Sequence, residues 1–477
     1  MDQNRMPLLE RLIGHAQKEP ISFHVPGHKY GTNFIAEGKQ YFQELLQLDA
    51  TELSGLDDLH SPEGVIKEAE QLLAQSSGAK RSYFLVNGST VGNLAMIMAA
   101  IKENDTVLVQ RNCHKSVLNG LNLVRATPVL LGPEVNIEWG VAGGVSLNTF
   151  KQAIQMYPQA KALILTYPNY YGMINDLEEI IELSHENGIP VLIDEAHGAH
   201  FKGEIFSKSA VQLNADIVVQ SAHKTLPAMT MGAYLHFNSQ IIPERNVTNY
   251  LQILQSSSPS YPIMASLDIA RSYLATFSIE DENALLRKIM DFRRELQQLN
   301  EINVLSYHNG KGDPLKITLQ STTSRSGYEM QQLLENEGIY SELADPYNVL
   351  LVFPLLKKNN DFPIEKVIRK FKTALRCTEH MKEIKTKITF KKPSISRLAF
   401  QLKDMSSMTS KPVSLEEAIG KVCAQFIIPY PPGIPLLFPG EIITYEDIEN
   451  IKLLQATGAR FQDEGSLKNG EVNVFLA

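Results

Sequence analysis

Between residues 65 and 240, short apolar runs alternate with stretches of helical periodicity. The runs are rich in β-branched and aromatic residues, end at turn residues, and occupy positions 83–86, 106–110, 128–132, 162–167, 190–194, 216–220 and 232–237. Strands that are apolar along their whole length are typical of a sheet covered by helices on both faces. The pattern therefore predicts an α/β domain built on a mostly parallel, seven-stranded sheet.

The rest of the chain predicts smaller parts. Residues 281–299 have a long amphipathic helical pattern, and further apolar runs and helical stretches follow, as in a small α+β domain. Ser414 and Glu417 have the spacing of a capping box, which predicts another helix. We expect an N-terminal arm (1–40), a large domain (41–280), a small α+β domain (281–385) and a C-terminal α/β segment (386–477) that begins with a linker-like stretch.

Composition narrows the class of protein without naming an activity. The 477 residues carry a formal charge of −8, with 43% hydrophobic and 21% charged residues, as in ordinary globular proteins. An acidic balance counts against a general nucleic-acid binder. The scattered Cys113, Cys377 and Cys423 favour a reducing compartment over a disulfide framework. No signal-peptide pattern or membrane-spanning apolar run is present, so we expect a cytoplasmic location with no membrane partner.

Two segments at predicted strand ends carry candidate chemistry. Lys224 follows the strand at 216–220, within the sequence SAHKT, where a desolvated lysine can form an imine with a carbonyl group. Asp194 ends the strand at 190–194 and lies 30 residues before Lys224, so both can lie at one edge of the sheet. The alternatives are a solvated surface lysine and an aspartate that merely caps a turn.

Two further segments suggest a bound anion and a flat ring. Ser89 and Thr90 stand in a Gly-Ser-Thr turn between a strand and a helix, where backbone N–H groups and hydroxyls hold phosphate well. They can equally be ordinary N-caps. His114 follows the strand at 106–110 and could stack on an aromatic ligand, although a single histidine is also compatible with a structural role.

Together these segments match pyridoxal 5′-phosphate. They offer a phosphate-binding turn, a carboxylate for the ring nitrogen, a ring for stacking and a lysine that can form an imine. Zinc is disfavoured because no His-x-x-x-His or cysteine cluster is present, and we expect no metal site. A P-loop is excluded because no lysine follows the glycine at the required spacing.

The order of the motifs adds a family resemblance that extends from residue 24 to residue 441. G-S-T, R-N-C-H-K-S, T-Y-P-N-Y-Y-G, D-E-A-H-G-A-H and S-A-H-K-T follow one another as in fold-type I pyridoxal phosphate enzymes. The flanking segments H-V-P-G-H-K-Y-G, L-D-D-L-H-S-P-E-G, S-S-S-P-S-Y and P-Y-P-P-G-I-P-L-L-F-P-G-E resemble, more narrowly, the bacterial ornithine/lysine/arginine decarboxylase family.

The resemblance implies a role for each matching residue. Lys224 would bind the cofactor covalently, Asp194 would pair with its ring nitrogen, and His197 would lie near its phenolic oxygen or the substrate carboxylate. His223 or Lys224 would return a proton to the substrate. The other expected cofactor contacts are Ser89, Thr90, Ser221 and His223 at the phosphate, His114 and Ala196 on the two ring faces, and Ser257 and Ser258 from a neighbouring subunit. Candidate substrate contacts are His28, Asp57, Asp58 and Glu441.

The resemblance also implies a reaction, the α-decarboxylation of a basic L-amino acid. Arginine giving agmatine, in polyamine synthesis, is the preferred substrate, followed by lysine giving cadaverine and then ornithine. An aminotransferase or carbon–sulfur lyase on the same fold, or a cofactor-binding protein without turnover, remains an alternative. The large members of the family carry a receiver-like domain before the cofactor domain, and here we expect the short form, assembled as a homodimer or dimer of dimers.

Overall fold

The computed structural model describes residues 1–376, 392–429, 434–462 and 465–476. Contacts between Cα atoms divide the chain into two compact units. Unit 1 comprises Met1–Ala100, Pro190–Lys202 and Lys208–Ser278, and unit 2 comprises Ile101–Ile189, Gly203–Ser207 and Ile279–Ala477. The four domains expected from the sequence remain a prediction, and each unit is described separately below.

Four strands of unit 1 lie in the order β1-β9-β8-β7. They are β1 (Arg81–Leu85), β9 (Ala233–Phe237), β8 (Ile217–Gln220) and β7 (Val191–Asp194). β7 and β8 are parallel, whereas β9 runs antiparallel to both β8 and β1. Every residue of β7, β8 and β9 is buried, which explains why their sequences are continuously apolar rather than alternating.

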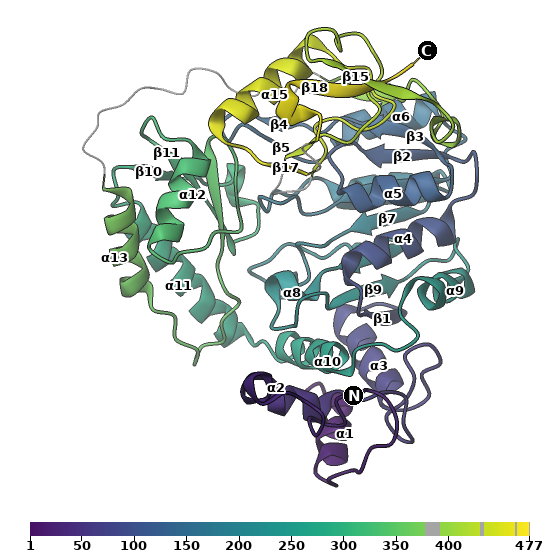
Figure 1. Cartoon of the computed structure of the whole chain (residues 1–477), viewed down its shortest axis with the longest axis vertical. Coiled ribbons are helices and arrows are strands. Elements are labelled where there is room, and N and C mark those ends of the chain that lie inside the picture. The colour runs from purple at the N-terminus through teal and green to yellow at the C-terminus, as the bar shows by residue number, and fades with distance from the viewer. Residues whose placement is uncertain (377–391, 430–433, 463–464, 477) are drawn as a thin grey trace. The chain divides into compact units, whose positions relative to one another are not determined.

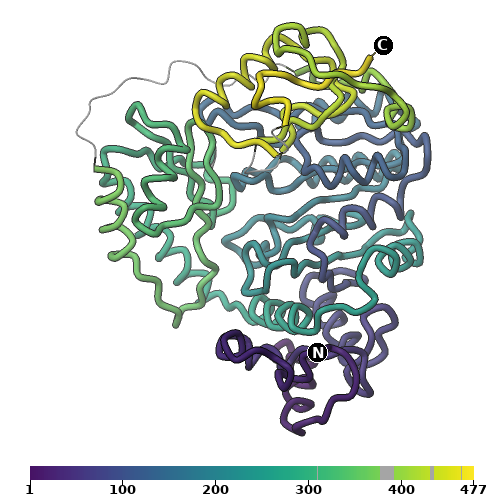
Figure 2. The backbone as a smooth tube through the Cα atoms, in the orientation of Figure 1, coloured from purple at the N-terminus to yellow at the C-terminus, as the bar shows by residue number. Residues whose placement is uncertain are grey.

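Helix α4 (Gly88–Ala100) connects this sheet to the candidate site because it packs on β1, β7, β8 and β9 (Figure 1). It begins at Gly88, whose φ of 75° lies in the left-handed region that glycine adopts at little cost. The other helices of unit 1 are α1 (Pro7–Ala16), α2 (Ala36–Leu48), α3 (Val65–Ser77), α8 (Ala222–Thr225), α9 (Glu244–Leu254) and α10 (Tyr261–Ala275). α1 packs against α3 and α10, and the purple trace of Figure 2 follows this N-terminal segment. The apolar pattern did not predict α2.

Unit 2 contributes a second set of strands in the order β6-β2-β3-β14. β6 (Ala162–Thr166), β2 (Thr106–Gln110) and β3 (Thr127–Leu131) are parallel, and β14 (Ile395–Arg397) pairs antiparallel with β3. Helices α5 (Lys115–Leu123), α6 (Leu147–Met156) and α7 (Leu177–Glu186) connect or flank them, and β4 (Val135–Asn136) pairs with β5 (Val141–Ala142). All seven strands predicted from the apolar runs are present, and the mostly parallel α/β class is confirmed; β14 is an additional strand.

The small α+β part also lies in unit 2. Its antiparallel sheet has the order β10-β11-β13-β12, formed by β10 (Ile302–Val304), β11 (Lys316–Ser321), β13 (Asn348–Val352) and β12 (Leu343–Ala344). Helices α11 (Ile279–Leu296), α12 (Gly327–Asn336) and α13 (Ile364–Leu375) accompany it, with a 3₁₀ turn, η1, at His308–Gly310.

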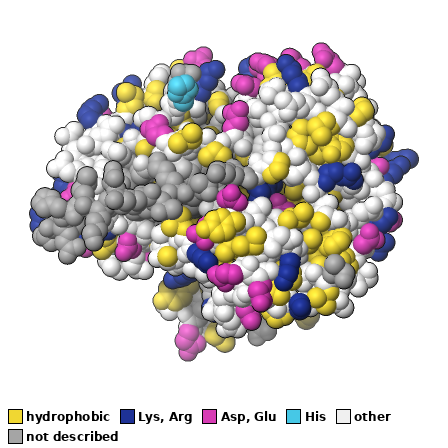
Figure 3. All heavy atoms as spheres, turned by 90° about the horizontal axis from the view of Figure 1, so that it is seen from above, with side chains coloured by type: hydrophobic (Ala, Val, Ile, Leu, Met, Phe, Trp, Pro, Cys, Tyr) yellow, Lys and Arg dark blue, Asp and Glu magenta, His cyan; other side chains and the backbone are white. Residues whose placement is uncertain are grey.

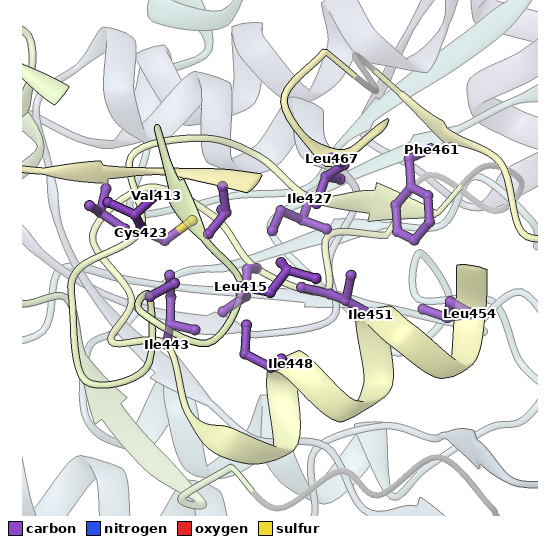
Figure 4. Close-up of a cluster of buried hydrophobic side chains, with 14 residues drawn as sticks. Val413, Leu415, Cys423, Ile427, Ile443, Ile448, Ile451, Leu454, Phe461 and Leu467 are labelled. Atoms are coloured by element: carbon purple, nitrogen blue, oxygen red, sulfur yellow. The ribbon is translucent and has the colours of Figure 1, made fainter. Parts of the chain in front are cut away.

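The C-terminal segment has its own apolar core, shown in Figure 4. Ile448, Ile451 and Leu454 from α15 (Tyr445–Thr457) pack with residues such as Val413 and Ile427. The remaining elements are α14 (Leu402–Met405), β15 (Ser410–Ser414), β16 (Ile428–Pro429), β17 (Phe461–Gln462), η2 (Leu467–Asn469) and β18 (Glu471–Phe475).

The helix predicted from the capping box at Ser414 is wrong. Ser414 Oγ does accept from the backbone N–H of Glu417 at 3.3 Å, but residues 415–420 form turns. Leu415 and Ala418 belong to the C-terminal core, and Gly420 has a φ of 81°, which ends the helical conformation after one turn. Tertiary packing therefore overrides the local capping signal.

Some sequence features lie outside the described residues, namely Cys377, residues 386–391 of the linker-like stretch and residues 430–433 of the Pro/Gly-rich motif. Within the part that is described, no helix combines the length and apolar character needed to cross a bilayer. On the face drawn in Figure 3, basic side chains are interspersed with acidic ones rather than gathered together.

Candidate active site

Asp194 and the segment that contains Lys224 leave the sheet at the same edge. β7 and β8 are parallel with Asp194 opposite Val219, so Asp194 and the residues that follow Gln220 share the carboxyl ends of the two strands. The Asp194 side chain is buried and accepts two hydrogen bonds, from Asn93 Nδ2 at 2.9 Å and from the backbone N–H of Ala196 at 3.2 Å. A buried carboxylate held in this way is well placed to pair with a cationic ring nitrogen.

Lys224 contacts His197 directly. Lys224 Nζ lies 3.0 Å from His197 Nε2, which is hydrogen-bond distance. One proton is shared between the two nitrogens, because the two side chains would repel each other if both were cations. His223 donates from Nδ1 to the carbonyl oxygen of Gly232 at 3.0 Å, which leaves its Nε2 as the acceptor nitrogen when the ring is neutral. The carboxyl ends of β7 and β8 therefore carry four titratable side chains, Asp194, His197, His223 and Lys224.

The phosphate-binding candidates lie at the start of α4. Ser89 and Thr90 are in the first turn of that helix, where backbone N–H groups have no acceptor within the helix and the dipole favours an anion. Ser221 Oγ donates to Ser89 Oγ at 2.8 Å, which links the start of α4 to the end of β8. The structure therefore brings Ser89, Ser221 and Lys224 into one connected group.

These residues fit pyridoxal phosphate on structural grounds. The buried Asn87 Oδ1, just before the start of α4, and the buried Thr225 Oγ1, next to Lys224, have no hydrogen-bond partner in the described chain. Polar atoms left in this way are expected where a ligand supplies the missing partner. Ala196 is buried two residues after the end of β7 and offers only a methyl group, as expected of a residue that packs against a ring face.

His114 belongs to unit 2 and caps α5. Its Nδ1 accepts from the backbone N–H of Ser116 at 3.2 Å and contacts Ser116 Oγ at 2.8 Å. Since Nδ1 acts as an acceptor, the ring orientation is set by the helix start. The capping role does not exclude the stacking role that the resemblance implies, which stays a prediction.

Ser257 and Ser258 lie in an exposed loop between α9 and α10 of unit 1. His60 Nε2 contacts the carbonyl oxygen of the preceding Ser256 at 2.8 Å and so ties the loop to the segment before α3. An exposed serine pair on an anchored loop has the accessibility required of a contact offered to another subunit.

Asp57 has a structural role in this chain. Its carboxylate accepts from the backbone N–H groups of Asp58, Glu63, Gly64, Ile66 and Lys67, and so caps the start of α3. Partial burial opposes ionisation, but the backbone donors outweigh it and lower the pKa of Asp57 below its usual range. Asp57 itself has a φ of 74°, as this tight turn requires.

Asp58 and His28, two other candidate substrate contacts, form fewer hydrogen bonds within the described part of the chain than Asp57 does. Asp58 Oδ1 accepts from the backbone N–H of His60 at 2.8 Å, and no other acceptor contact of this carboxylate occurs in the described chain. His28 pairs through Nε2 with Asp49 Oδ2 at 3.0 Å, whereas its buried Nδ1 has no partner among the described residues.

Glu441 is held by a residue that the sequence analysis missed. Arg111 donates from Nε to Glu441 Oε1 at 2.9 Å and from Nη2 to Oε2 at 2.6 Å, and both side chains are buried. Arg111 also donates to the carbonyl oxygens of Pro435 and Leu436 and lies over the ring of Phe438. Its position in R-N-C-H-K-S, after a strand, and the single acid in F-P-G-E were signals that could have suggested the pair.

Asn93 is the second residue that the sequence analysis missed. It lies in V-N-G-S-T-V-G-N, four residues after Ser89, so both face the same side of α4. A polar residue at this spacing within an otherwise apolar helix was the available signal.

Comparisons with known proteins identify the family of this chain. The family model described as Orn/Lys/Arg decarboxylase, major domain, matches residues 6–312, and the model of the C-terminal domain of the same family matches residues 383–463. The uncharacterized protein YaaO of Bacillus subtilis (strain 168) is 46% identical over 475 residues, covering 98% of each chain.

Two further relatives carry a named activity. An arginine decarboxylase of Bacillus subtilis (strain 168) is 34% identical over 472 residues, covering 94% of each chain. The crystal structure of the Francisella novicida lysine decarboxylase LdcF superposes with a TM-score of 0.82 and 22% identity, covering 99% of this chain and 81% of that chain, which supports the fold. The chain therefore belongs to the Orn/Lys/Arg decarboxylase family of fold-type I, pyridoxal phosphate-dependent amino-acid decarboxylases.

Proposed function

We propose that the protein removes the α-carboxyl group of a basic L-amino acid, with arginine giving agmatine as the first candidate and lysine giving cadaverine as the second. The observation that carries the proposal is the Lys224–His197 contact of 3.0 Å beside a buried Asp194 at one sheet edge. The 34% identity to an arginine decarboxylase supports arginine as the substrate, and we propose a place in polyamine synthesis with it.

The residues of unit 1 divide the binding of the cofactor among them. Lys224 would bind its carbonyl group, Asp194 would hold a proton at its ring nitrogen, and Ser89, Thr90, Ser221 and His223 would hold its phosphate. Bound pyridoxal phosphate supplies a ring that accepts the electrons released when the Cα–carboxylate bond breaks. Ala196 would pack on one face of the ring.

Proton transfer falls to the groups around Lys224. The Lys224 amine would carry a proton during the reaction, and the His197 ring, whose Nε2 lies 3.0 Å from Lys224 Nζ, can share that proton. Lys224 or His223 then returns a proton to Cα after CO₂ has left. We also propose that His197 would contact the substrate carboxylate or the phenolic oxygen of the cofactor.

We propose that Asp58 and His28 contact the cationic end of the substrate side chain. Asp57 and Glu441 are less suitable, because both oxygens of each carboxylate already accept hydrogen bonds within the chain. The Ser257–Ser258 loop reaches the phosphate bound by a second subunit, so the working form is a homodimer or a dimer of dimers. A cytoplasmic location fits the reduced cysteines Cys113 and Cys423.

The test is a CO₂-release assay on the purified protein with L-arginine, L-lysine and L-ornithine, with and without added pyridoxal phosphate. We expect release from arginine at the highest kcat/KM, and none at steady state from Lys224→Ala. Formation of an oxo acid without CO₂ would indicate an aminotransferase, and a visible band bleached by borohydride without CO₂ from any of the three would indicate binding without turnover.

A further inference from the structure

Asn93 forms one of the two hydrogen bonds that hold the Asp194 carboxylate. The distance from Asn93 Nδ2 to Asp194 Oδ2 is 2.9 Å, and the exposed fractions of the two residues are 1% and 3%. An ionised carboxylate only accepts hydrogen bonds, so the amide must turn its N–H toward Asp194. Because both groups are shielded from water, this charge-assisted bond stabilises the ionised form of Asp194 more than an exposed one would.

The position of Asn93 on α4 links the two ends of the proposed cofactor site. Ser89 and Asn93 are four residues apart and lie on the same face of the helix. Ser89 contacts Ser221 at the end of β8, whereas Asn93 contacts Asp194 at the end of β7. One helix face therefore contacts both the proposed phosphate site and the proposed ring-nitrogen site.

Gly92 lets this helix face reach the sheet. A Cβ atom added at Gly92 would lie 2.7 Å from Leu85 Cδ1 and 2.7 Å from Val219 Cγ1, closer than side-chain atoms approach one another. Val219 is the residue directly opposite Asp194 in the β7–β8 pair. The missing side chain at position 92 thus allows the helix to approach at the level where Asn93 meets Asp194.

We propose that Asn93 is a positioning residue that keeps Asp194 ionised and oriented toward the ring nitrogen of pyridoxal phosphate, and that Gly92 permits the required approach. The inference rests on the proposed role of Asp194 and is independent of which amino acid is decarboxylated. Without the amide donor, one oxygen of the buried carboxylate loses its partner, and the Asp194 side chain is held in place by the backbone N–H of Ala196 alone. A carboxylate held less firmly pairs less strongly with the charged ring nitrogen.

The experiment compares holoenzyme variants by the visible absorbance of the bound cofactor across a pH titration, by the rate of cofactor release on dilution, and by kcat. Asn93→Ala should shift the titration of the visible band, speed cofactor release and lower kcat about 10- to 100-fold. The matched control is Asn246→Ala. Asn246 on α9 donates to the carbonyl oxygen of Ala99 on α4 at 3.2 Å, and removing this hydrogen bond should change none of the three readouts.

Two further variants separate positioning from folding. In the nearly isosteric Asn93→Asp, the new carboxyl group donates only when protonated, so its spectrum should approach that of the wild type as the pH falls. Combining Asn93→Ala with Asp194→Asn should cost no more kcat than Asp194→Asn alone, because both act through one carboxylate. Additive losses in the double variant, or a visible titration and release rate unchanged in Asn93→Ala, would overturn the proposal.

The spectral readouts also separate this inference from the proposed function. If the wild type releases no CO₂ from any basic amino acid, the proposed reaction fails, while the visible titration and the release rate of Asn93→Ala still test the positioning role. If CO₂ release is robust and Asn93→Ala matches Asn246→Ala in every readout, the positioning role fails and the reaction stands.

Discussion

Asp57 and Asp58 are neighbours in sequence, but their carboxylates have different partners. Asp57 accepts from five backbone N–H groups at the start of α3, whereas Asp58 accepts from one. We predict that Asp57→Asn lowers the free energy of unfolding by about 1–3 kcal/mol, because one amide oxygen cannot replace two carboxylate oxygens. Urea denaturation measures this loss, and the KM for arginine should stay unchanged.

Asp58→Asn is the matched variant, with the opposite expected result. It should leave the urea midpoint close to that of the wild type and raise the KM for the basic substrate, since it removes a negative charge proposed to face the substrate cation. A raised KM in Asp57→Asn together with unchanged stability would return Asp57 to the substrate site.

The same pair shows what sequence can predict at the residue scale. The order of the motifs was sufficient to select Lys224, Asp194, Ser89 and Ser221, which the structure brings to one edge. It could not distinguish a carboxylate that binds a ligand from one that caps a helix, because Asp57 depends on backbone N–H groups that have no sequence signature. Asn93 was missed for a similar reason, since its partner is 101 positions away in the sequence.

At the scale of elements, the ion pair of Arg111 with Glu441 anchors the C-terminal segment to the end of β2. Glu441→Gln would leave the buried Arg111 guanidinium without its counter-charge. We predict a loss of roughly 3–5 kcal/mol in the free energy of unfolding, measured by urea or thermal denaturation. The substitution Glu417→Gln, at an exposed carboxylate of the same segment, should cost much less.

Removing both charges tests the reason for that loss. Arg111→Met combined with Glu441→Leu should be less destabilised than Glu441→Gln alone, because no unpaired charge stays buried. If Glu441→Gln is as stable as Glu417→Gln and instead raises the KM for arginine or lysine, Glu441 acts on the substrate rather than on the fold.

The elements themselves were predictable to different degrees. Strands such as β7 and β8 are buried on both faces, so their sequences are apolar throughout and easily recognised. The capping signal at Ser414 was misleading because Leu415, labelled in Figure 4, packs in the C-terminal core. Ala418 is buried in the same core. Helix α2 was missed by the sequence analysis; Leu46 is its only buried residue, so it contributes little to the core.

At the scale of the whole molecule, the exposed Ser257–Ser258 loop and two exposed apolar side chains of the N-terminal arm fit the proposed assembly of subunits. Ile21 and Phe23 are 87% and 95% exposed, so burying them against a second subunit would remove apolar surface from water. If the loop completes the site of a neighbouring subunit, Lys224→Ala and the double variant Ser257→Ala, Ser258→Ala carry defects in different sites of one hybrid dimer. Mixing the two should restore activity to about one quarter of that of the wild type, since half of the dimers are hybrids with one intact site.

The hybrid experiment uses differently tagged variants that are unfolded and refolded together and then separated by tag. Restored CO₂ release in the doubly tagged fraction, and not in either parent, supports shared sites. A doubly tagged fraction no more active than the average of its parents contradicts them.

The stability of the whole molecule should also depend on pH through a buried acid that the reaction does not use. Glu70 on α3 is 2% exposed and accepts one hydrogen bond, from the backbone N–H of Phe84 at 3.1 Å, while its Oε2 has no partner in the described chain. Burial raises the pKa of Glu70 to about 8, and burial likewise raises the pKa of Glu195 to about 7. Both acids are therefore protonated in the folded protein at mildly acidic pH.

The sign of the dependence follows from proton binding. Between the ordinary pKa of an unfolded glutamate, about 4.5, and the folded value of about 8, the folded chain keeps a proton on Glu70 that the unfolded chain releases. The contribution of Glu70 to stability is therefore complete below the unfolded pKa and is lost as the pH rises through the folded one, by up to about 1.4 kcal/mol per pH unit. Glu70→Gln cannot titrate, so its free energy of unfolding should fall less steeply over this range in urea denaturation. The exposed control Glu63→Gln should keep the slope of the wild type, and parallel curves for wild type and Glu70→Gln would contradict the raised pKa of Glu70.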